Sequence, residues 1–182
     1  MKNLIIALIL AVTTRSVAAQ TLMKTSSQEV TADLVAKREA LKKEVISSYL
    51  EIKNNLIVSD SLQASESAVK LAAALNQFKF KKLTLEEMNA ATIMRGKMKD
   101  LAARIAGTHV INKQRNYFME LSEEMWVLIE RFVPEKMALY EQKCPMTGKV
   151  WISDVKEIKN PYFPKNMLTC GEVTASVGIS KI

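Results

Sequence analysis

Residues 144–170 read CPMTGKVWISDVKEIKNPYFPKNMLTC, and this stretch separates two kinds of sequence pattern. It contains both cysteines of the chain, three of its four prolines and one of its two tryptophans. Before it, apolar residues recur at helical spacing, whereas within it short runs of strand-forming residues alternate with Pro, Gly and Asn. The pattern predicts a mainly helical chain with a small C-terminal module of different architecture.

The chain opens with the pattern of a secretory signal peptide. Lys2 supplies a positive charge, an apolar run follows, and small residues lead up to Ala19. We expect residues 1–19 to be removed after Ala19, with Ala18 as the alternative, and residues 20–27 to be a flexible N-terminus. The apolar run is too short to span a bilayer, and no second one follows it. The sequence therefore predicts a periplasmic protein, exported across the inner membrane, with no membrane span in its mature form.

Charge and motifs argue against several functional classes. The chain has 26 Lys and Arg against 19 Asp and Glu, and this modest positive excess is typical of a solvated surface. No basic stripe alternates with aromatic residues, so nucleic-acid binding is not predicted. The sequence has a single histidine and lacks a Cys-x-x-Cys motif, a glycine-rich phosphate loop and a zinc-protease motif. We therefore predict that the protein is not an enzyme.

Residues 28–136 are predicted to form an antiparallel four-helix bundle, because four amphipathic segments follow one another with short connections. The expected elements are a helix over 28–58, a second from the cap Asp60, a third from the capping box Thr84 and Glu87, and a fourth from His109 or Asn112 to Phe132. The second helix is expected to bury Leu62, Val69 and Leu75, and the fourth Leu121 and Leu128.

Residues 137–174 are predicted to be a small Cys- and Met-bearing module that packs on the bundle. Runs over 137–143 and 149–153 flank a Met-Thr-Gly turn and indicate a β-hairpin. The proline-rich segment 160–164 is expected to be an ordered loop, because its two aromatic side chains need burial. The last residues, 175–182, are expected to be a loose tail.

Four sulfur-bearing side chains gather at the two ends of the opening stretch. Cys144 and Met146 are two residues apart around a stiff proline, and Met167 and Cys170 are three apart, a spacing that one turn brings together. Thiolate and thioether sulfurs are preferred ligands of soft ions such as Cu(I). If the hairpin folds back on the loop, the four sulfurs can surround one ion.

A disulfide between Cys144 and Cys170 is the competing interpretation. Two cysteines in an exported chain commonly oxidise, and closing this loop would stabilise the fold by about 3–4 kcal/mol on the chain-entropy model. The spacing alone leaves both interpretations open. His109 is a further candidate ligand, because imidazole suits copper, although a lone histidine is more commonly structural.

Several sequence elements together resemble one family of exported bacterial proteins. They are Cys144-Pro145-Met146, Trp151-Ile152-Ser153, Glu157 to Phe163, Met167 to Gly171, and, in the helical part, Tyr49-Leu50, His109, Gln114-Arg115, Phe118 and Leu121-Ser122. The family is a domain of unknown function, common in Bacteroidetes, that occurs alone or fused to the adaptor subunits of copper/silver efflux pumps. The resemblance covers nearly all of the mature chain, and it departs from the family at Pro164, where a glycine is usual.

The resemblance implies a helical domain, an envelope location and a link to copper handling. It favours Cys144, Met146, Met167 and Cys170 as the ligands of Cu(I) or Ag(I), with His109 as an additional candidate. The expected function is periplasmic binding of such an ion, as a buffer or as a donor to an efflux adaptor. The alternative is a disulfide-stapled interaction module of the cell envelope that binds no metal.

Overall fold

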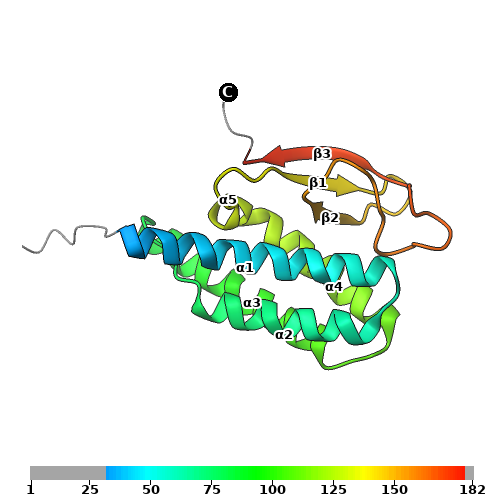
Figure 1. Cartoon of the computed structure of the whole chain (residues 1–182), viewed down its shortest axis with the longest axis horizontal. Helices are drawn as coiled ribbons and strands as arrows, with labels where there is room; N and C mark the ends of the chain where they lie inside the picture. Colours follow the sequence, from blue (N-terminus) through cyan, green and yellow to red (C-terminus); the bar gives the residue numbers. More distant parts are fainter. Residues whose placement is uncertain (1–31, 179–182) are drawn as a thin grey trace, which may run out of the picture. The chain divides into compact units, whose positions relative to one another are not determined.

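Helices make up most of the structure, and a small antiparallel sheet follows them in the chain (Figure 1). The computed structural model describes residues 32–178, and the compact unit begins at Ala36. The elements are α1 (Ala32–Ile57), α2 (Ser61–Gln77), α3 (Leu85–Ala106), α4 (Ile111–Val127), α5 (Ile129–Phe132), β1 (Leu139–Lys143), β2 (Val150–Ser153) and β3 (Glu172–Val177). The predicted signal peptide, the segment 20–27, the start of the first predicted helix and residues 179–182 lie outside the described residues.

The predicted helix caps set the starts of α2 and α3. The Asp60 carboxylate accepts a hydrogen bond from the backbone N–H of Gln63 at 3.0 Å. At α3, the Glu87 N–H donates to the Thr84 hydroxyl at 3.2 Å, and the Thr84 N–H donates to the Glu87 carboxylate at 2.8 Å. The second pair is a complete capping box, as predicted.

The last predicted helix is divided in the structure. Leu128 adopts φ −105° and ψ 11°, so the helical hydrogen-bond ladder is interrupted between α4 and α5. Leu121 is fully buried as predicted, but Leu128, at the interruption, is only half-buried. The continuous spacing of apolar residues therefore predicted one helix. The structure has two, because the backbone dihedral angles of Leu128 are not helical.

The predicted inner face of α2 is only partly right, because Leu75 is fully buried as predicted but Leu62 and Val69 are not. Leu62 is 60% exposed and Val69 is 58% exposed, whereas Ala64, Ala68 and Leu71 are fully buried. The buried residues are spaced by four and three, as a helix face requires. Because alanine side chains are small, α2 packs closely against α3 along them. Small side chains therefore make up most of the inner face of α2, together with Leu71 and Leu75.

The sheet has the strand order β2–β1–β3, and all neighbouring strands are antiparallel. The β1–β2 hairpin confirms the prediction, with Lys143 opposite Val150. The third strand corrects the prediction of a loose tail over 175–182, because residues 172–177 pair with β1. β3 is largely exposed, and only Ala175 and Val177 are partly buried. Val177 packs against the hydrophobic core, and backbone pairing with β1 holds the rest of the strand.

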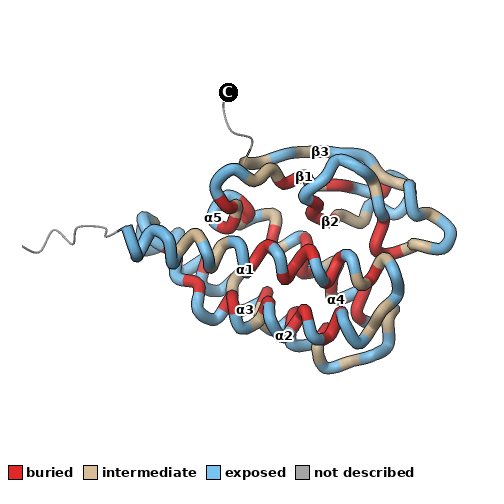
Figure 2. Tube along the Cα trace, in the orientation of Figure 1, coloured by how far each residue is buried: buried red, intermediate tan, exposed pale blue. Residues whose placement is uncertain are grey.

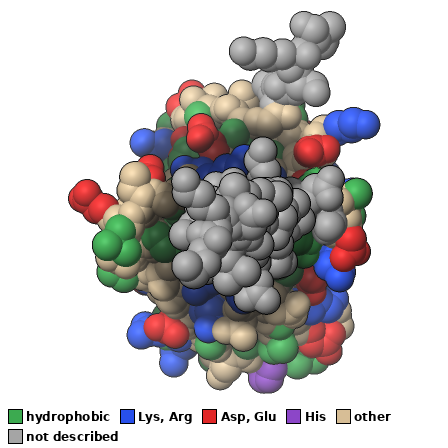
Figure 3. Space-filling model, turned by 90° about the vertical axis from the view of Figure 1, so that its left-hand side faces the viewer, with side chains coloured by type: hydrophobic (Ala, Val, Ile, Leu, Met, Phe, Trp, Pro, Cys, Tyr) green, Lys and Arg blue, Asp and Glu red, His purple; other side chains and the backbone are tan. Residues whose placement is uncertain are grey.

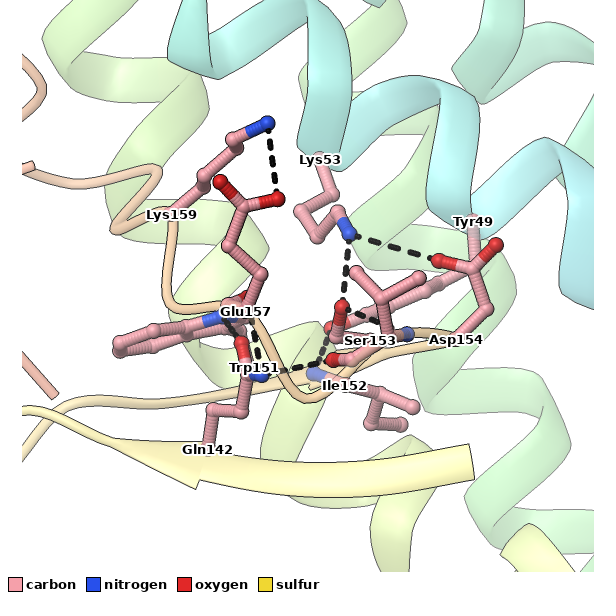
Figure 4. Close-up of polar contacts among 10 residues, drawn as sticks. Tyr49, Lys53, Gln142, Trp151, Ile152, Ser153, Asp154, Glu157 and Lys159 are labelled. Carbon is pink, nitrogen blue, oxygen red and sulfur yellow. Dashed lines mark hydrogen bonds and ion pairs between the residues drawn. The ribbon is translucent and has the colours of Figure 1, made fainter. Parts of the chain in front are cut away.

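Two side chains of α1 attach the sheet to the helices (Figure 4). The Tyr49 hydroxyl accepts a hydrogen bond from the Ile152 N–H at 3.0 Å. One turn later, the Lys53 ammonium donates to the Ser153 hydroxyl at 3.1 Å and lies 3.8 Å from the Asp154 carboxylate. Burial lowers the pKa of Lys53, and the negative charge of Asp154 partly offsets this effect. β2 is therefore fixed to α1 by buried polar contacts.

Gln142 holds the segment that follows β2 (Figure 4). It is fully buried on the central strand, and its amide nitrogen donates to the carbonyl oxygens of Val155 and Glu157 at 2.9 and 3.2 Å. Its amide oxygen accepts a hydrogen bond from the Trp151 indole at 2.6 Å. Every polar atom that this side chain brings into the core therefore has a partner.

Burial and surface charge follow from this arrangement. Buried residues lie on the sides of the helices that face one another and the sheet (Figure 2). On the face shown in Figure 3, Lys and Arg side chains are interspersed with Asp and Glu. Within residues 32–178, no helix combines the length and apolarity that crossing a membrane requires.

Candidate functional site

The two cysteines meet beside the sheet. Both are free thiols, and their Sγ atoms are 3.0 Å apart. Cys144 follows β1 and is fully buried, and Cys170 lies two residues before β3 and is half-buried. Because β1 and β3 are antiparallel with Lys143 opposite Glu172, Cys144 and Cys170 lie just beyond the same end of this strand pair. The sheet register that the sequence did not reveal is therefore what brings the thiols together.

A tight turn surrounds the sulfur of Cys144 with hydrogen-bond donors. The N–H groups of Thr147 and Gly148 donate to the Cys144 carbonyl at 3.3 and 2.8 Å, and Gly148 has φ +70°, which favours glycine. Burial raises the pKa of Cys144. The Thr147 hydroxyl, the Cys170 thiol and the backbone N–H groups of Thr147 and Met146 hydrogen-bond its sulfur and together place the pKa below its ordinary value.

The pKa of Cys170 is shifted in the opposite direction. Its hydrogen bond to Cys144 raises the pKa of Cys170, and burial raises it further. Of the two thiols, Cys144 therefore loses its proton more readily than Cys170. A thiolate beside a thiol is a nucleophile, a metal ligand and one half of a disulfide.

The two methionines of the predicted site lie in the turns that carry the cysteines. The Cys170 N–H donates to the Met167 carbonyl at 3.1 Å, which closes a four-residue turn over Met167–Cys170. The Met167 side chain is half-buried. The Met146 side chain is 76% exposed, although its backbone N–H reaches the sulfurs. Both thioethers therefore belong to the same surface region as the thiols, with that of Met146 facing solvent.

His109 lies elsewhere, in the connection between α3 and α4. Its Nδ1 is 3.4 Å from the Ser65 hydroxyl of α2, and the Gln114 amide donates to the same hydroxyl at 3.0 Å. The structure therefore places His109 in a polar cluster that joins α2 to α4, while the four sulfur residues lie beside the sheet. Within residues 32–178, no three His, Cys, Asp or Glu side chains are grouped as a metal site.

Asn160 holds the loop that carries Cys170, and sequence reasoning treated it only as part of a motif. It is fully buried, its N–H donates to the Leu168 carbonyl at 2.7 Å, and its amide nitrogen donates to the Cys170 carbonyl at 3.3 Å. Its amide oxygen accepts from the N–H groups of Tyr162 and Phe163 at 2.9 and 3.3 Å. The Asn-Pro pair was the available signal, because such pairs initiate turns.

Gly171 allows the chain to pass directly against Trp151. A Cβ atom at Gly171 would lie 2.9 Å from the Trp151 Cη2 atom and 2.8 Å from the Ile158 Cγ2 atom. Trp151 is fully buried, so its ring has little room to move. The position of Cys170, one residue earlier, therefore depends on the absence of a side chain at Gly171.

The distance between the thiols suits two kinds of chemistry. A disulfide requires the sulfurs to approach to about 2.05 Å. A tetrahedral metal with sulfur bonds of about 2.3 Å would separate them to roughly 3.8 Å. At 3.0 Å the pair is about 1 Å from either geometry, so small shifts of the two turns reach both.

Comparison with known proteins identifies the helical part of the chain. No curated protein and no solved structure matches the sequence at a significant level. One family pattern matches residues 45–137, just over half of the chain, from within α1 to the residues before β1. Cys144 and Cys170 lie beyond the matched range, in the sheet region. The chain belongs to the family described as "Protein of unknown function (DUF3347)".

Proposed function

We propose that this protein binds a soft metal ion, Cu(I) or Ag(I), through Cys144 and Cys170 with the thioethers of Met146 and Met167. The N-terminal signal pattern and the resemblance to envelope proteins associated with copper and silver efflux support a periplasmic role, as a buffer or as a donor to an efflux adaptor. We also propose that the helices act as an antiparallel four-helix bundle that supports the sulfur-bearing module.

The 3.0 Å contact between the free thiols of Cys144 and Cys170 is the observation that carries the proposal. A thiolate, not a thiol, is the form that binds metal. Burial raises the pKa of Cys144, but hydrogen bonding to its sulfur lowers it by more, so this thiol forms the metal-binding thiolate more readily than an ordinary cysteine does. When a cation binds between the two sulfurs, both thiols give up their protons to water.

The methionines supply soft, uncharged sulfur on the same two turns. Thiolate and thioether ligands select Cu(I) over harder ions, because their sulfur atoms are polarizable. The exposed side chain of Met146 is free to turn toward an incoming ion, and the short turn holds Met167 near Cys170. A site built in this way takes up an ion from solvent and releases it at the surface.

A second candidate function follows from the contact between the two sulfur atoms. Loss of two electrons and two protons to an oxidant, such as the thiol-oxidising machinery of the periplasm, would join Cys144 and Cys170 in a disulfide. The bond would close a loop between positions 26 apart in the sequence. In that form the protein is a stapled interaction module without a metal.

A competitive Cu(I) titration of the reduced, full-length mature protein tests the first function. We expect one Cu(I) per chain, at least about tenfold weaker binding in Cys144→Ser, and weaker binding in Met146→Leu and Met167→Leu. Leucine preserves bulk and removes only the thioether. The matched control is Met94→Leu on α3, which changes a half-buried methionine outside the sheet region and should leave the affinity unchanged.

The outcomes separate the candidates. Equal Cu(I) affinity for the wild type and both methionine variants would exclude the thioethers as ligands. Reduced protein that takes up no Cu(I) would overturn the metal-binding proposal as a whole. Finding no free thiols in protein taken directly from the periplasm would favour the disulfide-stapled module.

A further inference from the structure

A cavity of about 330 Å³ lies between the turn that joins α1 to α2, the N-terminal part of α4 and the loop over 162–166. Three cationic side chains line it: Arg115, Lys149 and Lys165. None of its ten lining residues is acidic, and amide side chains and the aromatic rings of Tyr162 and Phe163 complete the wall. The cavity is therefore a concentration of positive charge with an aromatic side.

Arg115 is the fixed cation of this cavity. It is only 9% exposed, yet all its acceptors are neutral. Its Nε donates to the Pro161 carbonyl at 2.9 Å, Nη2 to the Leu56 carbonyl and the Ser59 hydroxyl, each at 2.9 Å, and Nη1 to the Asn112 amide oxygen at 3.2 Å. Buried charges are ordinarily paired with an opposite charge, and here the cavity wall supplies none. Burial accordingly lowers the pKa of Arg115.

The two lysines add further positive charge. The Lys149 ammonium lies 5.2 Å from the ring centre of Tyr162 and 5.0 Å from that of Phe163, so aromatic faces hold it at the cavity wall. Lys165 is exposed on the loop. Among the ion pairs formed within residues 32–178, none involves Arg115, Lys149 or Lys165. Their charges remain available to a ligand.

A strained residue contributes to the same wall. Ser59 has φ +61°, in the left-handed region that few residues other than glycine adopt. This conformation turns the chain between α1 and α2 so that the Ser59 hydroxyl lines the cavity and accepts from Arg115. Backbone strain of this kind clusters at ligand sites, where the surrounding structure holds it in place.

We propose that this cavity binds a phosphate group, either free or carried by a small organic molecule. A phosphate brings up to two negative charges, which balances the unpaired cations better than a single carboxylate does. Arg115 already uses four of its five N–H donors, so it cannot form the two-bond fork that favours a carboxylate. The lysine ammonium groups act as point charges, which suit a tetrahedral oxyanion. The proposal is independent of the sulfur chemistry beside the sheet.

Isothermal titration of the mature protein with inorganic phosphate and with phenyl phosphate tests this proposal. Chloride is used to hold the ionic strength constant. We expect saturable binding of one anion per chain, weakened at least about tenfold in Lys149→Gln and in Lys165→Gln, because each removes a charged donor. The matched control is Lys43→Gln, which removes the same charge from an exposed position on α1 and should leave the affinity unchanged.

Each result decides the proposal. Stronger binding of phenyl phosphate than of inorganic phosphate supports an organic phosphate whose substituent contacts the aromatic wall, and equal binding supports free phosphate. Absence of saturable binding of either probe overturns the proposal. Equal weakening in Lys43→Gln and the two cavity variants also overturns it, because net charge alone would then account for the effect. Circular dichroism of each variant verifies that the fold is intact.

Discussion

Replacing Gly171 by alanine tests whether the contact with Trp151 positions Cys170. The added Cβ atom would lie 2.9 and 3.3 Å from two ring carbons of Trp151 and 2.8 Å from the Ile158 Cγ2 atom. Carbon atoms ordinarily approach to about 3.5–4.0 Å, so two of these contacts are short by roughly 0.6 Å or more. The half-buried Ile158 can rotate, but the fully buried Trp151 cannot. The chain at Gly171 must therefore move away from the indole.

Overpacking of this size costs about 1–3 kcal/mol. For a domain of about 150–250 residues, each kcal/mol lowers the melting temperature by about 2–4 °C. We therefore expect the reduced Gly171→Ala protein to melt about 2–12 °C below the wild type. Because Cys170 precedes the displaced residue, formation of the disulfide and binding of Cu(I) should both weaken.

Thermal and urea denaturation of the reduced protein measure the predicted loss, and Gly96→Ala is the matched control. Gly96 lies within α3, and a Cβ atom there would meet nothing within 4 Å. That substitution should raise the free energy of unfolding by about 0.5–1 kcal/mol, because alanine favours the helix. If Gly171→Ala proves as stable as the wild type, the contact with Trp151 does not hold Cys170 in place.

Three further predictions follow from burial, hydrogen bonding and protonation. Leu121→Ala should lower the free energy of unfolding, measured in urea, by about 2–5 kcal/mol, and Leu128→Ala should lower it by less than about 2 kcal/mol, because only Leu121 is fully buried. Equal losses of stability in the two variants would contradict the break between α4 and α5. Asn160→Ala should cost at least about 2 kcal/mol by leaving buried loop groups without partners, and an unchanged unfolding midpoint would contradict this. The pKa of Cys144 is lower in the folded than in the unfolded chain, so the unfolded chain binds more protons between the two values. The contribution of Cys144 to the stability of the reduced protein should therefore rise as the pH increases toward the unfolded-state pKa of about 8.5. This contribution is lost as the pH falls through the folded-state pKa. The pKa of Cys170 is raised instead, so its contribution is lost as the pH rises above about 8.5. Urea unfolding at a series of pH values should show the rise in the wild type and not in Cys144→Ser.

The helix starts and the β1–β2 hairpin could be predicted from the sequence, because each depends on residues that are close together in the chain. The caps at Asp60 and at Thr84 with Glu87 set helix starts through hydrogen bonds to residues three positions away, so a short window contains all the information. The β1–β2 hairpin was predictable for the same reason. The inner face of α2 could not be predicted in full from the sequence, because it depends on how α2 packs against α3.

In the candidate site, too, local features could be predicted and features that depend on packing could not. The sequence placed Cys144 and Cys170 together as a hypothesis, but the contact depends on β3, whose pairing with β1 had no recognisable pattern of buried side chains. The lowered pKa of Cys144 could not be predicted from the sequence either, because it depends on how the folded turn places Thr147 and Met146 beside the sulfur. Gly171 could not be understood before Trp151 was known to lie beneath it.

The sulfur site and the anion cavity are joined by two short segments, 144–149 and 162–170, yet their tests remain separable. The Cys144 N–H donates to the Lys149 carbonyl at 3.0 Å, so the backbone of Lys149 supports the thiolate turn while its ammonium lies on the cavity wall. Lys149→Gln keeps that carbonyl and removes only the charge, so phosphate binding should weaken while Cu(I) affinity stays constant. Gly171→Ala moves Cys170 and leaves the cavity lining unchanged, so it should have the reverse effect. A variant that impaired both activities would show that the turn itself, rather than either side chain, links the two sites.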